Sequence, residues 1–303
     1  MTSNVGIGML YGFGAAMAIS VSYILSRTFV RQPARSPLQL LILAHVIMGI
    51  FSLALLPWTW SVPVGGWASA WLAATSAALF YLAAQALLFY ILRETSASNI
   101  APLLGLKIGI AALIGLALGN TLTGQQWLAV LLTLVAALLL RNSAEGVTLR
   151  LIGLALATCG LYCGSDYSIG AVMEAFGAAP NIRTVLFAVT LPYLVCGALA
   201  CAGFGIIRRA TKREWHHALA YASAWYAGMI GLFGAISYIG VVFGIMMQST
   251  RGIITVLLGI VLVAVGVAAD EGTPSVQTRC RQLIAAVLMI TAIALYQSGL
   301  TPA

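Results

Sequence analysis

The amino-acid sequence predicts an all-α integral membrane protein with ten transmembrane helices in two inverted five-helix repeats. Apolar residues fill 61% of the 303 positions and charged residues only 7%, whereas soluble domains carry about a quarter of their residues as charges. The apolar residues gather in ten long runs, and most basic residues lie in alternate connections between these runs. The mean hydropathy of +1.02 excludes a water-soluble fold, because too little polar surface is available to cover it.

Each apolar run is long enough, or nearly so, to cross a bilayer as a helix of about 20 residues. Segments rich in proline, glycine and charge separate the runs, as at 31–37, 57–63 and 270–274. Long unbroken runs argue against membrane strands, which alternate over about ten residues. In order, the runs are 5–27, 38–56, 67–92, 98–118, 126–140, 150–173, 183–207, 221–247, 252–269 and 282–299.

The basic residues predict how the helices are oriented. Arginines follow the first run and none precedes it, which is the reverse of a secretory signal. With ten helices the odd-numbered connections share one side, and the positive-inside rule makes that side cytoplasmic. Only Arg183 and Arg251 lie opposite, so we expect a multi-pass inner-membrane (cell-membrane) protein with both termini on the extracytoplasmic side. The bases of the odd-numbered connections are Arg27, Arg31, Arg35, Arg93, Arg141, Arg150, Arg208, Arg209, Lys212, Arg213, Arg279 and Arg281.

A weak internal repeat relates the two halves of the chain. Ile7-Gly8 aligns with Ile152-Gly153 at an offset of 145 residues, and the serine- and tyrosine-containing segments 20–23 and 165–168 align at the same offset. Each half holds five runs, and an odd number inverts the second copy relative to the first. The predicted repeats are residues 1–145 and 146–303. The alternative is chance similarity, because apolar segments resemble one another by composition.

The segment from Thr95 to Lys107, with the small-residue stretch that continues to Trp127, resembles the drug/metabolite transporter superfamily in its EamA-like branch. This resemblance covers essentially the whole chain through loose patterns, and it implies ten helices and a transport activity. The chain departs from the family pattern at Lys107, where a proline is usual, and at Asn120, where a glutamate is usual. Lys107 with Arg251 is also similar to the arrangement in sugar-phosphate and nucleotide-sugar carriers. Typical EamA-like exporters have a cytoplasmic amino end, the reverse of the orientation expected here.

Ionisable groups inside a bilayer cost roughly 2.5 to 3.5 kcal/mol each, so each needs a partner, water or a function. Lys107 and Asp166 lie within apolar runs and form either a neutralising structural pair or part of a substrate site. His45 is either a satisfied buried histidine or a ligand contact. Arg251 opens the ninth run near the outer surface, where it either anchors a helix end or binds substrate. Tyr81 and Tyr238 either line a central cavity or have a lipid-facing or packing role. The same two alternatives apply to Phe89, Tyr90, Trp225, Tyr226 and Phe233.

These features favour a secondary active transporter, an exporter or exchanger of a small metabolite that works by alternating access, with the site between the repeats near the midplane. Pro102 and Pro192 interrupt helices and suit a gate. The expected partners are a small-molecule substrate and the lipid bilayer, with a coupling proton as a further candidate and no nucleic acid. No cofactor or metal is expected, since the five cysteines are interpreted as packing residues.

A non-transporting structural or sensory membrane protein is the alternative. An integral membrane enzyme is less favoured, because the histidines outside the second run, His216 and His217, are adjacent in a connection where they cannot form a catalytic array.

Overall fold

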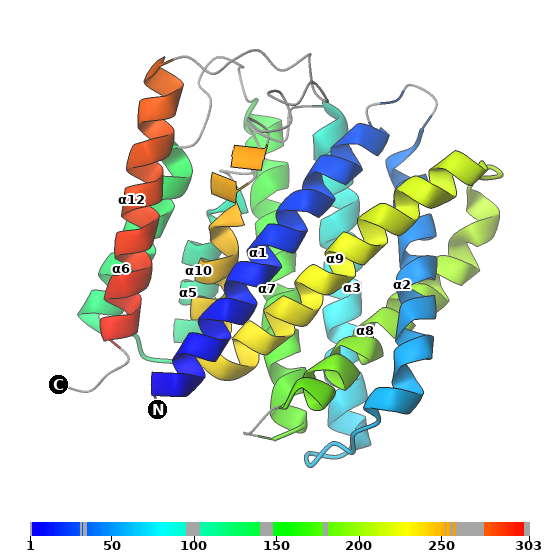
Figure 1. Ribbon diagram of the computed structural model, residues 1–303, viewed down its shortest axis with the longest axis horizontal. Coiled ribbons are helices and arrows are strands. Elements are labelled where there is room, and N and C mark those ends of the chain that lie inside the picture. The colour runs from blue at the N-terminus through cyan, green and yellow to red at the C-terminus, as the bar shows by residue number, and fades with distance from the viewer. Residues whose placement is uncertain are drawn as a thin grey trace.

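The computed structural model describes residues 2–30, 32, 35–94, 104–139, 148–177, 181–251, 253–254, 257–258 and 276–299, and these residues form helices and no strands (Figure 1). The predicted all-α class is therefore confirmed. Pro102, the start of the fourth predicted run and most of the ninth lie outside the described residues. The helices are α1 (Thr2–Val30), α2 (Pro37–Thr59), α3 (Trp67–Glu94), α5 (Lys107–Ala117), α6 (Gly124–Leu139), α7 (Leu149–Ala175), α8 (Ile182–Ala202) with a short 3-10 helix (Gly203–Ile206), α9 (Lys212–Ile239), α10 (Val241–Ser249) and α12 (Val276–Ser298).

Local sequence signals set several helix starts. The side chain of Ser36 caps α2, with proline in its first turn, and Thr148 and Asn181 cap α7 and α8 through their side-chain oxygens. At α9, Thr211 and Glu214 form a reciprocal capping box. These polar residues satisfy amide groups that the first turn of a helix leaves without partners.

The predicted boundary between the eighth and ninth runs is wrong. The run 221–247 is one apolar stretch, but the chain reverses inside it at Gly240, whose φ of +76° suits glycine. The residues before this point belong to α9 and those after it to α10. Hydropathy could not locate the turn, because a single glycine makes it and no polar residue marks it.

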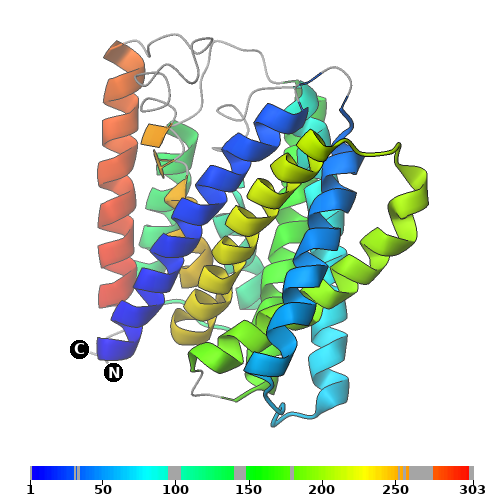
Figure 2. The same ribbon diagram turned by 45° about the vertical axis from the view of Figure 1, so that its right-hand side comes forward.

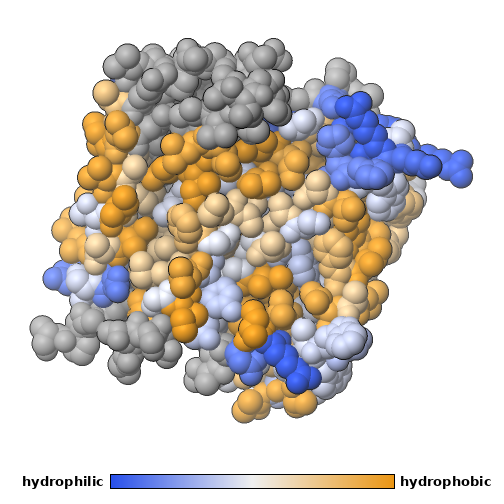
Figure 3. Space-filling model, in the orientation of Figure 1, coloured by the Kyte–Doolittle hydropathy of each residue, from blue (hydrophilic) through white to orange (hydrophobic). Residues whose placement is uncertain are grey.

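Five of the described helices are long and apolar enough to cross a membrane: Val5–Val30, Pro37–Thr59, Trp67–Glu94, Ile182–Ile206 and Lys212–Ile239. Three shorter apolar helices, Lys107–Ala117, Gly124–Ala136 and Leu283–Ser298, accompany them. The molecular surface has the same character, with apolar residues across the middle of the face shown in Figure 3 and a strongly hydrophilic patch at its upper right. The chain is a multi-pass membrane protein, and the count of ten crossings stays a prediction.

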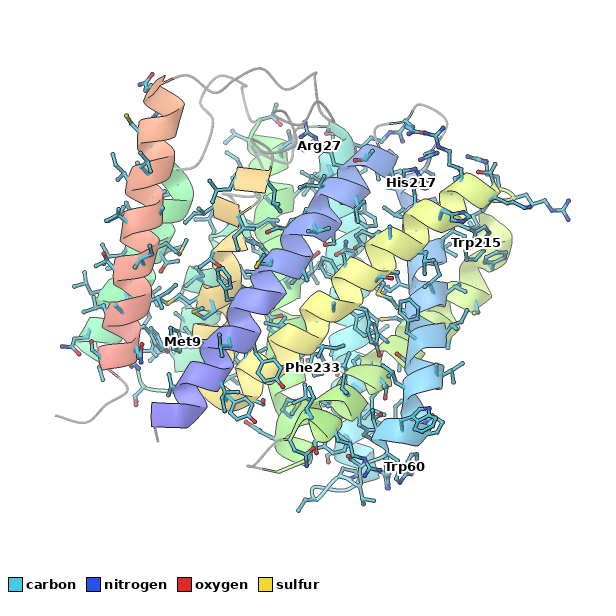
Figure 4. The ribbon with its side chains drawn as sticks, in the orientation of Figure 1. Met9, Arg27, Trp60, Trp215, His217 and Phe233 are labelled. Carbon is cyan, nitrogen blue, oxygen red and sulfur yellow. The ribbon has the colours of Figure 1, made fainter. Side chains whose placement is uncertain are left out.

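The helices pack in pairs that are distant in sequence. The most extensive contacts join α1 to α9, α3 to α7, α2 to α8 and α6 to α12. Figures 1 and 2 show α1 and α9 side by side and the α6–α12 pair at one edge of the bundle. The first residues of α1 and the last of α12 lie at the same end as Trp60, and Arg27, Trp215 and His217 lie toward the other (Figures 1 and 4).

Two of these pairs make very close helix contacts through glycine. A Cβ atom placed on Gly49 of α2 would lie 2.9 Å from the Cα atom of Gly197 on α8. On α9, a Cβ atom at Gly231 would lie 2.8 Å from the carbonyl oxygen of Tyr11 on α1. The absence of side chains at these points lets the backbones touch, as in small-residue contacts between membrane helices.

Candidate functional site

Lys107 lies at an interruption in the fourth hydrophobic run. Leu104 is helical, Gly105 and Leu106 form a turn, and α5 begins at Lys107. The described part of the fourth predicted run is therefore not one continuous helix. A cation at a helix N-terminus opposes the helix dipole, and this cation is only 3% exposed. Lys107 thus needs specific partners.

Those partners come from two other helices. The Lys107 ammonium forms an ion pair with Asp166 of α7 and donates a hydrogen bond to Oε1 of Gln248 on α10, at 3.2 Å. It also lies 5.3 Å from the centre of the Tyr162 ring, a distance typical of a cation–π contact. Cys163 donates from Sγ to the carbonyl oxygen of Lys107 at 3.3 Å. Side chains of α7 and α10 thereby fix the position of the helix interruption at Lys107.

Arg251 lies in the same region, and its predicted place near the outer surface is wrong. It is 6% exposed, and its guanidinium carbon lies 5.3 Å from the centre of the Tyr23 ring on α1. A turn residue, Thr250, separates Arg251 from the end of α10. The hydropathy profile places a turn directly before Arg251. The chain reverses earlier, at Gly240, so that the whole of α10 lies between the turn and Arg251. Ser20 donates to its carbonyl oxygen at 3.2 Å.

Lys107, Asp166, Gln248 and Arg251 are called here the charged cluster. Arg251 is close enough to interact electrostatically with the Asp166 carboxylate. All four side chains are buried, so the cluster brings two cations, one carboxylate and one amide together in the interior. A site of this composition can bind a polar or anionic solute through charge-assisted hydrogen bonds.

An aromatic cluster, formed by Tyr23, His45, Tyr81, Tyr193, Tyr221 and Trp225, adjoins the charged cluster. Trp225 is its centre: the indole stacks on Tyr81 at 5.5 Å and on Tyr221 at 6.0 Å between ring centroids. The indole N–H donates to the Tyr193 hydroxyl at 2.7 Å. The Tyr23 ring, which contacts Arg251, lies 6.2 Å from Trp225 and so links the two clusters.

His45 and Tyr81 contact each other within the aromatic cluster. Nε2 of His45 lies 3.1 Å from the Tyr81 hydroxyl, and Nδ1 lies 2.6 Å from the carbonyl oxygen of Leu41. Both ring nitrogens of the fully buried His45 therefore have partners. Its geometry fits a satisfied buried histidine and also places it beside the aromatic rings.

Tyr238 does not join the other candidates. It stacks on Tyr11 at 6.0 Å between ring centroids, near the end of α9. Tyr90 is also outside the clusters: it is 38% exposed and accepts a hydrogen bond from Arg150. Arg183 is exposed in the first turn of α8, as expected of a residue at a helix end.

Sequence reasoning missed three cluster members, Tyr193, Tyr221 and Gln248, and two residues that contact the clusters, Gln85 and Tyr162. Gln85 donates to the Tyr221 hydroxyl at 2.8 Å and accepts from Tyr162. A signal was available for Gln85, because it is an amide in an otherwise apolar stretch. The tyrosines gave none, since aromatic residues occur throughout the runs.

Among the described residues, no group of three or more His, Cys, Asp or Glu side chains could hold a metal ion. Cys159 and Cys163, one turn apart on α7, have no disulfide and donate to main-chain carbonyls of Leu104 and Lys107.

Part of the chain is similar to a known family. The model of the EamA-like transporter family matches residues 6–142, somewhat less than half of the chain. Over these residues the chain is similar to that family. This match confirms the predicted resemblance to the drug/metabolite transporter superfamily. The description of that family is of transporters.

The fold of this chain recurs among solved structures, of which 28 chains match. One, titled "Crystal structure of protein", has a TM-score of 0.65 and 18% sequence identity, with 95% of each chain covered. At this identity the likeness shows the fold alone. No curated protein matches the chain.

Proposed function

We propose that this chain is an EamA-like secondary active transporter that exports or exchanges a small metabolite by alternating access, with its substrate site at the charged cluster and the adjoining aromatic rings. The observation that carries the proposal is the buried ion pair of Lys107 and Asp166 beside a helix interruption. A buried ion pair adds little stability compared with apolar residues of the same volume. Its presence is therefore better explained by ligand binding than by packing alone.

The helix pairs support a division into two five-helix halves, 1–145 and 146–303. Exchanging each helix for its counterpart turns the pair α1–α9 into α7–α3, and both pairs are among the most extensive contacts. The pairs α2–α8 and α6–α12 each join a helix to its own counterpart. Under this division Lys107 and Arg251 occupy equivalent positions, so the proposed site lies between the halves.

Alternating access is supported by the burial of the site and by interruptions in the helices that form it. Lys107, Asp166 and Arg251 are at most 6% exposed, so helices must move before a solute reaches them. The interruptions at Gly105–Leu106 and Thr250 and the proline inside α8, Pro192, are places where backbone ladders are already broken.

Solute flux in proteoliposomes tests the proposal. Purified protein is reconstituted and assayed by efflux and counterflow with a panel of labelled metabolites. Lys107→Ala and Asp166→Asn are expected to reduce flux at least tenfold, whereas Glu94→Gln, which removes a surface ion pair with Arg150, should leave it unchanged. Normal flux in both site variants would refute the site, and no flux for any solute would refute the transporter.

Accessibility of single cysteines separates a carrier from a structural or sensory protein. Cys201 and Cys280 are exposed and are first replaced, and the buried cysteines are kept. Single cysteines in α5 and α10 should then react with a membrane-impermeant thiol reagent from alternate sides, in a solute-dependent way. Static protection at every position would favour the structural alternative.

The expected orientation has its own test. A periplasmic reporter fused after Ala303 should be active in the inner membrane, and a cytoplasmic reporter should be inactive. The opposite result would place the termini in the cytoplasm. Dependence of counterflow on a proton gradient would identify the candidate coupling proton.

A further inference from the structure

Resting on the proposed function, we infer that Asp166 occupies the place of the substrate's anionic group, and that a solute with one negative charge binds by displacing the Asp166 carboxylate from Lys107. Asp166 thus competes with the solute anion for the Lys107 ammonium group. The substrate class that follows is a small organic molecule with a single negative charge, carried by a carboxylate or a group of similar size.

The contacts of Lys107 show what the anion would replace. The ammonium is surrounded by the Asp166 carboxylate, Oε1 of Gln248 and the Tyr162 ring face. Of these partners only Asp166 is ionic, and it reaches Lys107 from a different helix, α7 against α5. An incoming carboxylate can make the same charge-assisted contact. The amide and the ring can stay in place, so Gln248 and Tyr162 would frame the bound anion.

The balance of charge sets the number of negative charges on the solute. Lys107 and Arg251 carry two positive charges and Asp166 one negative charge, so these three buried groups sum to +1. A monoanion brings this sum to zero, whereas a dianion or a neutral solute leaves a net charge in a region of low dielectric. Arg251 already interacts with Asp166, so the displaced carboxylate keeps a cationic neighbour.

Tyr23 supplies an independent sign of a ligand. Its side chain is 4% exposed, and in the described part of the chain its hydroxyl has no hydrogen-bond partner. The guanidinium carbon of Arg251 lies 5.3 Å from the centre of the Tyr23 ring. A buried hydroxyl without a partner is costly, and a solute oxygen bound beside Arg251 would accept a hydrogen bond from it. We therefore assign Tyr23 as a second contact to the solute.

Binding to the full-length protein in detergent tests the inference without requiring transport. The probes are formate and benzoate, with benzamide as the neutral analogue and phthalate as the dianion, measured by shift of the melting temperature over a concentration series. Wild type should respond to monoanions more than to benzamide or phthalate. Asp166→Asn should bind monoanions at least tenfold more tightly, because its own competing charge is gone. Glu94→Gln is the matched control and should behave as wild type.

The inference can still be tested if Asp166→Asn folds poorly. If that variant is unstable because Lys107 is left without its carboxylate, added formate should restore its melting temperature, while formamide should not. Tyr23→Phe should fold at least as well as wild type yet bind the best monoanion about tenfold less tightly.

The inference is overturned if Asp166→Asn neither gains monoanion affinity nor is rescued by formate, or if Tyr23→Phe binds as wild type does. These outcomes are distinct from failure of the proposed function. A protein that binds monoanions in this pattern but moves no solute would refute transport and leave the inference standing. Flux of a neutral solute that is indifferent to Asp166→Asn would refute the inference alone.

Discussion

The ion pair between Lys107 and Asp166 links the start of α5 to the middle of α7 at a point where both side chains are only 4% exposed. Each group depends on the other, because a buried charge without a partner is far more costly than the pair is favourable. Gln248 adds a third helix to this contact. The same two residues therefore contribute both to the stability of the fold and to the proposed substrate site.

Lys107→Met should lower the free energy of unfolding by about 3 to 5 kcal/mol, because it leaves the Asp166 carboxylate buried without its cation. The double variant Lys107→Met with Asp166→Leu should recover most of this loss, since no uncompensated charge remains. Unfolding of the purified protein, followed by tryptophan fluorescence, measures both effects. A double variant as unstable as the single one would show that the pair is worth more than its mutual neutralisation.

Gln85 holds two tyrosines from different helices, Tyr221 on α9 and Tyr162 on α7. Gln85→Leu should cost more stability than Tyr221→Phe, because it removes two buried hydrogen bonds, which contribute roughly 0.5 to 1.5 kcal/mol each. A double-mutant cycle between Gln85→Leu and Tyr221→Phe should give a coupling energy of about 1 kcal/mol. Additive effects would mean that the hydrogen bond contributes nothing.

The contact of Gly49 with Gly197 predicts a strong effect of a single methyl group. Gly49→Ala would place its Cβ atom 2.9 Å from the Cα atom of Gly197, and separating α2 from α8 should cost about 1 to 3 kcal/mol. Gly153→Ala is the control, because no atom lies within 4 Å of its added Cβ. There the change should stabilise the helix by about 0.5 to 1 kcal/mol. Similar melting temperatures for the two variants would contradict the close packing.

Glu214 is buried at the start of α9 and contacts residues of two connections, the one before α9 and the one between α1 and α2. It caps the helix with Thr211, pairs with Arg208, and lies 3.8 Å from Nε of Arg35 beyond α1. Glu214→Ala should lower stability by about 1 to 2 kcal/mol through loss of the cap alone. Thr211→Ala removes the cap and keeps the ion pairs, so a smaller loss in that variant would assign the remainder to Arg35 and Arg208. Equal losses would assign the whole effect to the cap.

Hydropathy and charge were sufficient to predict the helical class and most helix positions, because each run must bury or shield its own apolar surface. They also singled out Lys107 and Asp166, since a charge within an apolar run is conspicuous. The depth of Arg251 could not be predicted in this way. It depends on the reversal at Gly240, which has no signature in average hydropathy. The aromatic cluster could not be predicted from sequence either, since only the packing of α3, α8 and α9 distinguishes Tyr193 and Tyr221 from tyrosines that face outward.

Gly240 has a mechanical consequence. It is the only residue between α9, which carries Tyr221 and Trp225, and α10, which carries Gln248. No loop is present to absorb a displacement, so a tilt or rotation of α9 is transmitted directly to the end of α10 and the turn before Arg251. Rearrangement of the aromatic rings and repositioning of the cations are therefore geometrically coupled through a joint of one residue. Lengthening that joint by a few flexible residues would uncouple the two movements.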